Sequence, residues 1–529
     1  MILARKSKSG SLNYMSSSSR NDGPELFLGL AAAVGSDLDR VIDKLSEALV
    51  KANYQSHPIR LASLMNQIPV FRDKLIKDPA DEYIDSHMTQ GNELRRKTDH
   101  NDAMAILGIG TIKRIRSEMG GSGMRPKGRH AYILRSLKHP DEVATLRRIY
   151  GDNFYLIAAY APHERRKEYL SYRIARSKHE NQSNQFYSKA EYLIQRDFEE
   201  TGVEHGQNLR DTFHRADVFL DTTNEEKLDE SLTRFVELIF GNTLHTPSRS
   251  EYVMFHAKAA ALRSAELGRQ VGCAIAHANG DIVAVGTNEV PRAGGGLYWC
   301  DDKPDMREFL RGTDSSDEHK QNLVADTLRR LKESGWLEAS KSSLSVPELV
   351  KQILSGNTPV LSKQSMIRNV IEFGRAVHAE MAAIVDAARR GVSISDCTMY
   401  VTTFPCHLCA RHIVAAGIQK LIYIEPYPKS LTAELYPDSI KLEGGTKDSH
   451  QIAFEPFVGI SPRQYMKLFD AEGMNRKSAE GKAIVFDASK AQLRYRSSER
   501  LYLEDEDHLM DDLTTSLGKL GIEFGGEHA

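Results

Sequence analysis

CTMYVTTFPCHLCARHIVAAGIQKLIYIEP, residues Cys397–Pro426, is the stretch that decides the fold of the C-terminal half of the chain. Its first seven residues are rich in β-branched and aromatic side chains and predict a strand, and KLIYIEP predicts a second one. Between them a helix is predicted to begin at Pro405, since proline is favoured in the first turn. Strands that alternate with helices in this way predict an α/β domain.

Cys406 and Cys409 form a C-x-x-C pair at the beginning of this helix. Such a pair alone is ambiguous, because redox pairs, halves of zinc knuckles and buried cysteines share the spacing. The sequence holds no second pair to complete a four-cysteine site, and a thioredoxin-type motif requires a different strand–helix context. The other cysteines, Cys273, Cys300 and Cys397, are interpreted as unrelated to a site.

His378 and Glu380 open an Ala-rich segment, AVHAEMAAIVDAARR, that predicts another helix. Taken alone, they are also compatible with a polar first turn in which Glu380 complements the helix dipole. H-x-E followed after 24 residues by P-C-x-x-C is, however, the signature of zinc-dependent nucleobase deaminases. Three protein ligands, His378, Cys406 and Cys409, leave the fourth position of one zinc ion per subunit open to water, which the metal acidifies. Glu380 is then the predicted proton carrier.

The rest of the chain predicts two α/β domains within four segments. We expect a disordered tail (1–24), an N-terminal P-loop-like parallel α/β domain (25–243), a deaminase domain (244–470) and a C-terminal extension (471–529). The deaminase domain is expected to contain a long insertion (291–369) that interrupts its strand–helix pattern. Strands such as NFYLIAAYA and ADVFLDTT, each followed by a helix, indicate the parallel sheet of the first domain.

Composition excludes several classes of protein. Apolar residues make up 40% of the 529 residues, charged residues 27%, and the formal net charge is −2, as in a water-soluble globular chain. No run of about 18 apolar residues predicts a membrane span, and the N-terminus lacks the apolar core of a secretory signal. Five cysteines are too few for a disulfide scaffold, so a reducing, cytoplasmic location is expected.

GLAAAVGSDL, Gly29–Leu38, follows a predicted strand and precedes a predicted helix, as a phosphate-binding loop does. A Walker A motif needs G-x-x-x-x-G-K-[ST]. Aligning its second glycine with Gly35 places Ser36 at the lysine position and Asp37 at the Ser/Thr position. Phosphoryl transfer is therefore not expected. Nucleotide binding by Gly29, Gly35, Ser36 and Asp37 and a purely structural loop both remain open.

The segments GRQVGCAI, GDIVAVGTNEVPRAGG, VHAEMAAI and TTFPCHLCARHIVAAGIQKLIYIEPYPKS resemble deoxycytidylate deaminases, over roughly Ala257–Lys429 apart from the insertion. The resemblance implies a cytidine-deaminase-like α/β/α sandwich with a mixed five-stranded sheet. It also implies that Asn288 contacts the sugar hydroxyl of the substrate, although Asn288 is also compatible with a simple turn. Further substrate-binding residues by the same resemblance are Val271, Gly272, Thr403, Ala379 and Pro405.

Nucleotide phosphates require cations. Arg269, which precedes the Val-Gly pair, and Lys429, which follows the last matched strand, are candidates for this role. Basic segments at Thr111–Pro140 and His163–Lys178 are candidates for binding phosphate or RNA, but a solvated charged face is the commoner outcome for such segments.

Across most of its length the chain resembles bacterial phage-defence deaminases of the AvcD type, in segments such as YLIAAYAPHERR, HTPSRSEY and GGGLYW. This resemblance implies deamination of dCTP and/or dCMP, a homo-oligomer, and in some members an inhibitory RNA partner. Two other functions stay open from the residues alone. One is deamination of cytosine in DNA or RNA, and the other is nucleotide sensing by the P-loop-like domain beside a vestigial deaminase.

Overall fold

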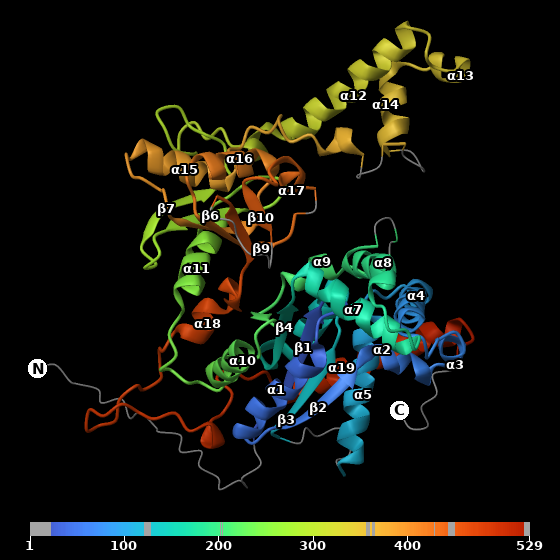
Figure 1. Cartoon of the computed structure of the whole chain (residues 1–529), viewed down its shortest axis with the longest axis vertical. Coiled ribbons are helices and arrows are strands. Elements are labelled where there is room, and N and C mark those ends of the chain that lie inside the picture. The colour runs from blue at the N-terminus through green and yellow to red at the C-terminus, as the bar shows by residue number, and fades with distance from the viewer. Residues whose placement is uncertain are drawn as a thin grey trace, which may run out of the picture.

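The computed structural model describes residues 23–120, 128–200, 203, 205–355, 360–361, 365–427, 429–442 and 450–522. The predicted tail, apart from Gly23 and Pro24, lies outside these residues, as does most of the glycine-rich basic segment at 120–129. The described residues form two lobes, each built around a six-stranded sheet (Figure 1). Among them, no helix is long and apolar enough to cross a membrane.

The sheet of the N-terminal lobe has the strand order β12-β5-β4-β1-β3-β2. Strands β1 to β5 are parallel, as predicted, but the edge strand β12 runs antiparallel to β5 and makes this sheet mixed. Residue patterns near 459 gave no signal for β12, because its two residues pair with a strand more than 200 positions away. The strands are β1 Leu26–Ala32, β2 Gln55–Arg60, β3 His130–Arg135, β4 Phe154–Tyr160, β5 Val218–Asp221 and β12 Gly459–Ile460.

Both faces of this sheet are covered, which explains why all seven residues of β1 are buried and apolar or glycine. Alternate residues of β1 point to opposite faces, so Leu28 packs in one core cluster and Phe27 in the other. One face carries α1 (Leu38–Lys51) and α10 (Glu225–Ile239). The other carries α5 (Ala103–Glu118), α6 (Pro140–Tyr150) and α19 (Glu499–Lys519).

A group of helices lies beyond the carboxyl ends of the strands in this lobe. Helices α4, α7 and α8 pack on one another through a small apolar cluster of their own. The group and its neighbours are α2 Leu61–Leu64, α3 Pro69–Arg72, α4 Ala80–Thr98, α7 His163–Ser177, α8 Tyr187–Phe198 and α9 Leu209–Phe213.

The sheet of the C-terminal lobe has the order β10-β11-β9-β8-β6-β7. It is mixed, as predicted, because β6 runs antiparallel to both neighbours while β8, β9, β11 and β10 are parallel. It has six strands and not the five expected, and the strands at the β10–β11 end of the sheet have only three and five residues. The strands are β6 Gly272–Ala276, β7 Ile282–Thr287, β8 Thr398–Thr403, β9 Lys420–Glu425, β10 Ile440–Leu442 and β11 Ile452–Pro456.

Helix α11 (Arg249–Ala261) covers one face of this second sheet, and α15 (Ala379–Arg389) and α16 (His407–Ala415) cover the other. The predicted α/β/α sandwich is therefore present in these elements. A short helix, α17 (Thr432–Leu435), packs beside α16.

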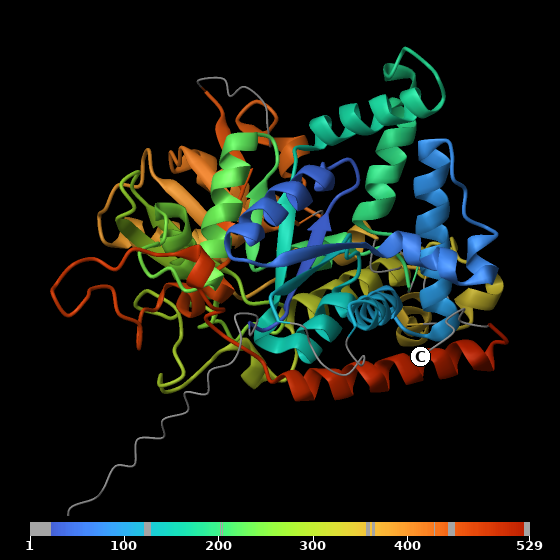
Figure 2. The ribbon, with the colours of Figure 1, turned by 90° about the horizontal axis from the view of Figure 1, so that it is seen from below.

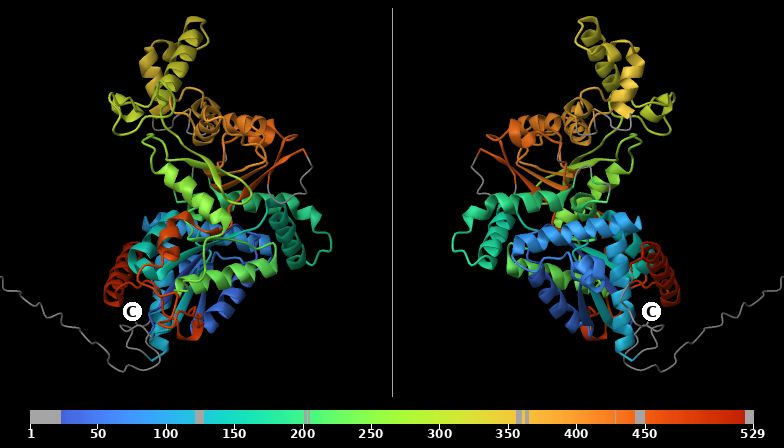
Figure 3. Two further views of the ribbon diagram at one scale, coloured as in Figure 1. Left: turned by 90° about the vertical axis from the view of Figure 1, so that its left-hand side faces the viewer. Right: turned by 90° about the vertical axis from the view of Figure 1, so that its right-hand side faces the viewer.

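The insertion between β7 and α15 forms a helical arm that projects from the second sheet (Figures 1 and 3). It contains α12 (Ser315–Glu333), α13 (Ala339–Ser342) and α14 (Val346–Ser355), with the short turns η4 (Glu308–Arg311) and η5 (Met366–Asn369) at its base. A small core centred on Val324, Leu328 and Leu349 holds α12 and α14 together.

After β11 the chain returns to the N-terminal lobe, through β12, α18 (Tyr465–Phe469) and α19. Figure 2 shows α19 lying along the outer edge of that lobe. The domain boundaries at 243 and 470 stay predictions, but α19, in the predicted extension, packs against α5 and α6.

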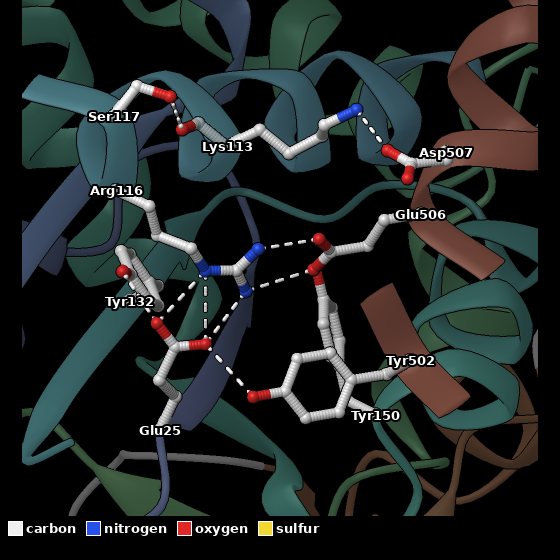
Figure 4. A network of polar contacts seen from close by, with 9 residues as sticks. All are labelled: Glu25, Lys113, Arg116, Ser117, Tyr132, Tyr150, Tyr502, Glu506 and Asp507. Atoms are coloured by element: carbon white, nitrogen blue, oxygen red, sulfur yellow. Dashed lines mark hydrogen bonds and ion pairs between the residues drawn. The ribbon is translucent and has the colours of Figure 1, made fainter. Parts of the chain in front are cut away.

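A buried polar network holds α19 in place (Figure 4). The guanidinium of Arg116 donates to the carboxylates of Glu25, at 2.7 Å, and Glu506, at 2.5 Å, and all three side chains are 0–1% exposed. Three tyrosines surround the ion pair: Tyr150 donates to Glu506, and Tyr132 and Tyr502 donate to Glu25. Every charge in the network therefore has an oppositely charged or hydroxyl partner, which a buried charge requires.

We predict that Arg116→Ala lowers the free energy of unfolding of the N-terminal lobe by about 3–5 kcal/mol, because two buried carboxylates lose their cation. Urea unfolding followed by circular dichroism measures this loss. Lys113→Ala is the matched control, since Lys113 pairs with Asp507 between the same two helices at the surface and should cost under about 1 kcal/mol. Equal losses in the two variants would contradict the prediction.

Candidate metal centre and active site

Three side chains from two helix starts meet in the C-terminal lobe. The Nδ1 atom of His378 lies 3.3 Å from the Sγ of Cys406 and 3.4 Å from the Sγ of Cys409. All three ligand atoms lie within 4.8 Å of one another, and no other such group of His, Cys, Asp or Glu occurs among the described residues. Tetrahedral zinc with Zn–N near 2.0 Å and Zn–S near 2.3 Å places its ligand atoms about 3.5 Å apart, so this donor set fits zinc.

Two helix N-termini create this arrangement. His378 is the residue before α15, and Cys406 is the residue before α16, with Cys409 in the first turn. Helices α15 and α16 pack side by side on the sheet, so that their positive dipole ends lie together. Hydrogen bonds with Cys409 and His378 lower the pKa of Cys406, which favours the thiolate that a metal requires.

Glu380 lies in the first turn of α15 and is 4% exposed. Burial raises the pKa of Glu380, because the charged form loses hydration. A carboxyl with a raised pKa beside the metal ligands is suited to taking up and giving back a proton.

These residues open onto a cavity of about 260 Å³. Eight of the residues predicted from the sequence line it: Arg269, Val271, Asn288, His378, Ala379, Glu380, Thr403 and Cys406. Five others were not predicted: Glu266, Gly268, Ile371, Phe404 and Tyr427. The sequence offered a weak signal for Phe404 and Tyr427, which flank the ends of β8 and β9, and none for Glu266 or Ile371.

Asn288 shapes one wall of the cavity. Its Oδ1 accepts from the Val271 backbone N–H at 2.7 Å, and its Nδ2 donates to the Arg269 carbonyl at 2.8 Å. The side chain therefore fixes the segment 269–271 along the cavity, and its second amide hydrogen is left to reach a ligand.

Arg269 and Glu425 lie at the rim. The Arg269 guanidinium is 3.5 Å from the Glu425 carboxylate, which also accepts from Thr403 Oγ1 at 3.4 Å. The Arg269 side chain is 59% exposed and can turn toward a ligand phosphate. Glu266 adds an acceptor, since its Oε2 is buried and has no hydrogen-bond partner among the described residues.

Three predicted substrate residues do not line this cavity. Gly272 lies under α11, where an added Cβ would be 1.9 Å from the Ala257 carbonyl. The Pro405 carbonyl accepts from Ser430 Oγ. Lys429 donates to Asn369 Oδ1 at 2.8 Å and lines a separate cavity of about 690 Å³ against the helical arm.

Gly286 was missed although it stands two residues before Asn288. An added Cβ there would be 2.1 Å from the Ala379 carbonyl. Glycine at this position therefore lets the first turn of α15 pack directly on β7. In this segment the sequence analysis predicts a role for Asn288 alone.

Of the four residues predicted to bind a nucleotide, three lie in the turn between β1 and α1 and one lies in β1. Gly29 lies inside β1, where an added Cβ would meet Leu137 and Phe154, so it is outside the loop itself, and its role in nucleotide binding stays a prediction. The motif alignment did not reveal that β1 continues to Ala32. Gly35 (φ +89°), Ser36 and Asp37 do lie in the turn before α1, and Asp37 caps that helix.

Comparison with known proteins finds a family model and several relatives that match part of the C-terminal lobe. Residues 247–425 match the model of the cytidine and deoxycytidylate deaminase zinc-binding region. A deoxycytidylate deaminase of Enterobacteria phage T2 is 54% identical over 54 residues, which are 10% of this chain and 29% of that protein. One of Mus musculus is 40% identical over 103 residues, 20% of this chain and 52% of that protein. The chain thus matches under a third of the length of the phage relative.

The dCMP deaminase of cyanophage S-TIM5 was found among solved structures. It is 17% identical, covers 40% of this chain and 100% of its own, and has a TM-score of 0.21. The sequence matches show that the C-terminal lobe contains a region similar to the zinc-binding region of cytidine and deoxycytidylate deaminases, which supports that part of the prediction.

We predict that the purified chain holds one zinc ion and that Cys409→Ala loses it, because two ligands cannot retain the metal against a chelator. Elemental analysis after dialysis measures the zinc content. Cys300→Ala is the control, since Cys300 is exposed and outside the site. A Cys409→Ala variant with undiminished zinc would overturn the assignment of the ligands.

Proposed function

We propose that this chain catalyses the zinc-dependent hydrolytic deamination of free deoxycytidine nucleotides, dCTP and/or dCMP, to deoxyuridine nucleotides. The observation that carries the proposal is the meeting of His378, Cys406 and Cys409 beside buried Glu380 in one cavity. The match of residues 247–425 to a deaminase zinc-binding region supports it.

Zinc held by three protein ligands supplies a Lewis acid that makes water at its open position acidic. Glu380 then carries the proton: its carboxylate takes a proton from the attacking water and passes it to N3 of cytosine. The oxygen of that water bonds to C4, and Glu380 then takes the remaining proton from the new C4 hydroxyl and gives it to the exocyclic nitrogen. The C4–N bond breaks to release ammonia and the C4=O bond of uracil forms. The raised pKa of Glu380 suits both directions of transfer.

The cavity suits a flat base attached to a charged tail. Val271, Ile371, Phe404 and Tyr427 provide apolar and aromatic walls for a pyrimidine. The second amide hydrogen of Asn288 is positioned for a sugar hydroxyl, and Arg269 at the rim for a phosphate. A polynucleotide would instead require a basic channel with stacking aromatics, whereas the cavity lining contains Arg269 as its one Lys or Arg among the described residues.

We predict that Glu380→Gln lowers turnover of dCMP and dCTP by about 10²–10⁴-fold while zinc stays bound, because the amide cannot carry the proton. Chromatography of the products and release of ammonia measure the rate. Glu434→Gln, an exposed carboxylate in the same lobe, is the control and should retain full activity.

Offering different cytosine compounds in the same assay distinguishes the proposed nucleotide deaminase from the two alternative functions. Uracil formation only in single-stranded DNA or RNA would assign a polynucleotide deaminase. Zinc-loaded protein without turnover of any cytosine compound would favour the nucleotide sensor.

We extend the proposal to a role in defence against phage through depletion of dCTP, in a cytoplasmic homo-oligomer held inactive by an RNA partner. The sequence resemblance to AvcD-type deaminases supports this extension.

During infection, bacteria carrying the wild-type chain are predicted to lose dCTP and gain deoxyuridine nucleotides, whereas bacteria carrying Glu380→Gln keep their dCTP. Nucleotide extraction and plaque counts measure the two effects. Equal phage protection by both variants would contradict a defence based on deamination.

A further inference from the structure

A second cavity lies in the N-terminal lobe, at the carboxyl ends of β1, β2 and β3. It has a volume of about 180 Å³ and is bounded by the turn before α1 and by α4. A more open cleft of about 370 Å³ adjoins it and shares Arg60, Tyr83 and Arg173 with it. Crevices at this edge of an open α/β sheet are where such folds bind ligands.

The inner cavity contains buried polar atoms without partners. Arg95 is 2% exposed, and its Nε has no hydrogen-bond partner among the described residues. The same holds for Oδ1 of Asp197, which is 0% exposed, and for Ser36 Oγ. Buried polar atoms are almost always paired in folded proteins, because an unpaired one costs about 1–3 kcal/mol. A ligand with both donors and acceptors would satisfy them.

Part of the remaining lining is apolar and aromatic, and it stands beside the charged side chains of Arg60, Arg135, Lys138, Arg173 and Glu142. Met65, Met88 and Met104 contribute polarizable side chains. Tyr83 and His87 lie ring to ring, with centroids 4.0 Å apart, on the same wall. Such walls, combined with unpaired hydrogen-bonding atoms, fit a flat heterocyclic base.

A phosphate does not fit the inner cavity, because a carboxylate already occupies the donors of the turn. Asp197 Oδ2 accepts from the Val34 backbone N–H at 2.7 Å and from Lys138 Nζ at 2.8 Å. Lys138 also donates to the Ala32 carbonyl. A phosphate at this turn would meet the negative charge of Asp197, which explains why the turn is not a conventional triphosphate site.

The outer cleft lacks the apolar Met side chains of the inner cavity and is lined mainly by cations. Four cations, Arg60, Lys77, Arg173 and Arg176, line it against the single acid Asp78. Asp39, outside the cleft, is 3.7 Å from Arg60 and neutralises part of one charge. The excess of positive charge fits phosphate groups.

We propose that these two adjoining cavities form a binding site for a nucleoside 5′-phosphate, with the base in the inner cavity and the phosphates in the outer cleft. The site is separate from the deaminase centre and does not depend on the proposed deamination.

Calorimetric titration of the full chain carrying Glu380→Gln, which prevents turnover, tests this site. ATP, dATP, dTTP and their monophosphates are the probes, with adenosine and tripolyphosphate as partial ligands. We expect at least one nucleotide to bind at one per chain, and adenosine and tripolyphosphate to bind far more weakly. Arg173→Glu and Arg176→Glu should each weaken nucleotide binding about tenfold or more, since each loses a charge-assisted contact.

Arg165→Glu is the matched control, because Arg165 is exposed on α7 with Arg173 and lines neither cavity. It should leave the affinity unchanged. Absence of binding by every nucleotide, equal weakening by Arg165→Glu, or equal affinity for tripolyphosphate alone would overturn the proposal. Binding of RNA in place of every mononucleotide would overturn it as well. None of these readouts uses deamination, so failure of the site and failure of the proposed enzyme activity are distinguishable.

Discussion

The backbone of α15 touches the backbone of β7 at Gly286, and the geometry of the metal centre depends on this contact. The carbonyl of Ala379 would lie 2.1 Å from a Cβ at position 286, and Ala379 is the residue between the histidine ligand and Glu380. Gly272 plays the same part on the opposite face, where α11 packs on β6. Helices held at backbone distance have little freedom to tilt, and this rigidity is what a preorganised site requires.

The two lobes are joined through buried carboxylates as well as through apolar packing. Glu251, at the start of α11, accepts from Arg234 of α10 and from the backbone N–H of Ile460 in β12, so it links both sheets. One apolar cluster includes Phe27 of β1, Met254 of α11 and Phe457. With α19 bound to Arg116, the last described helix packs on the same lobe as the first described strand, and one core cluster is shared by residues of both lobes.

The sequence was most informative for features that depend on residues close together in the chain. H-x-E and P-C-x-x-C identify the candidate ligands, which the fold brings together because each motif lies at a helix start, and strand–helix alternation predicts the sandwich. The features that the sequence did not predict depend on residues that are far apart in the chain. Arg116 and Glu506 are 390 positions apart, and each looks like an ordinary surface charge in its own helix. Short strands such as β10 have too few residues for a period-2 pattern. Gly29 was assigned to the loop because a glycine in a strand and one in a phosphate loop look alike until the strand's end is known.

The end of α8, beside the inner cavity of the N-terminal lobe, carries charges that influence the pKa of Lys429 in the C-terminal lobe. Asp197, which closes the turn before α1, stands near the end of α8, and Glu199 follows it with an ion pair to Arg210 at 2.5 Å. Burial and repulsion from Lys320 and Arg210 lower the pKa of Lys429 in the C-terminal lobe, while Glu199 acts in the opposite direction. Lys429 in turn donates to Asn369 at the base of the helical arm. Asp197 and Glu199 are two residues apart, so one short segment at the end of α8 supplies both the carboxylate that closes the turn before α1 and the partner of Arg210.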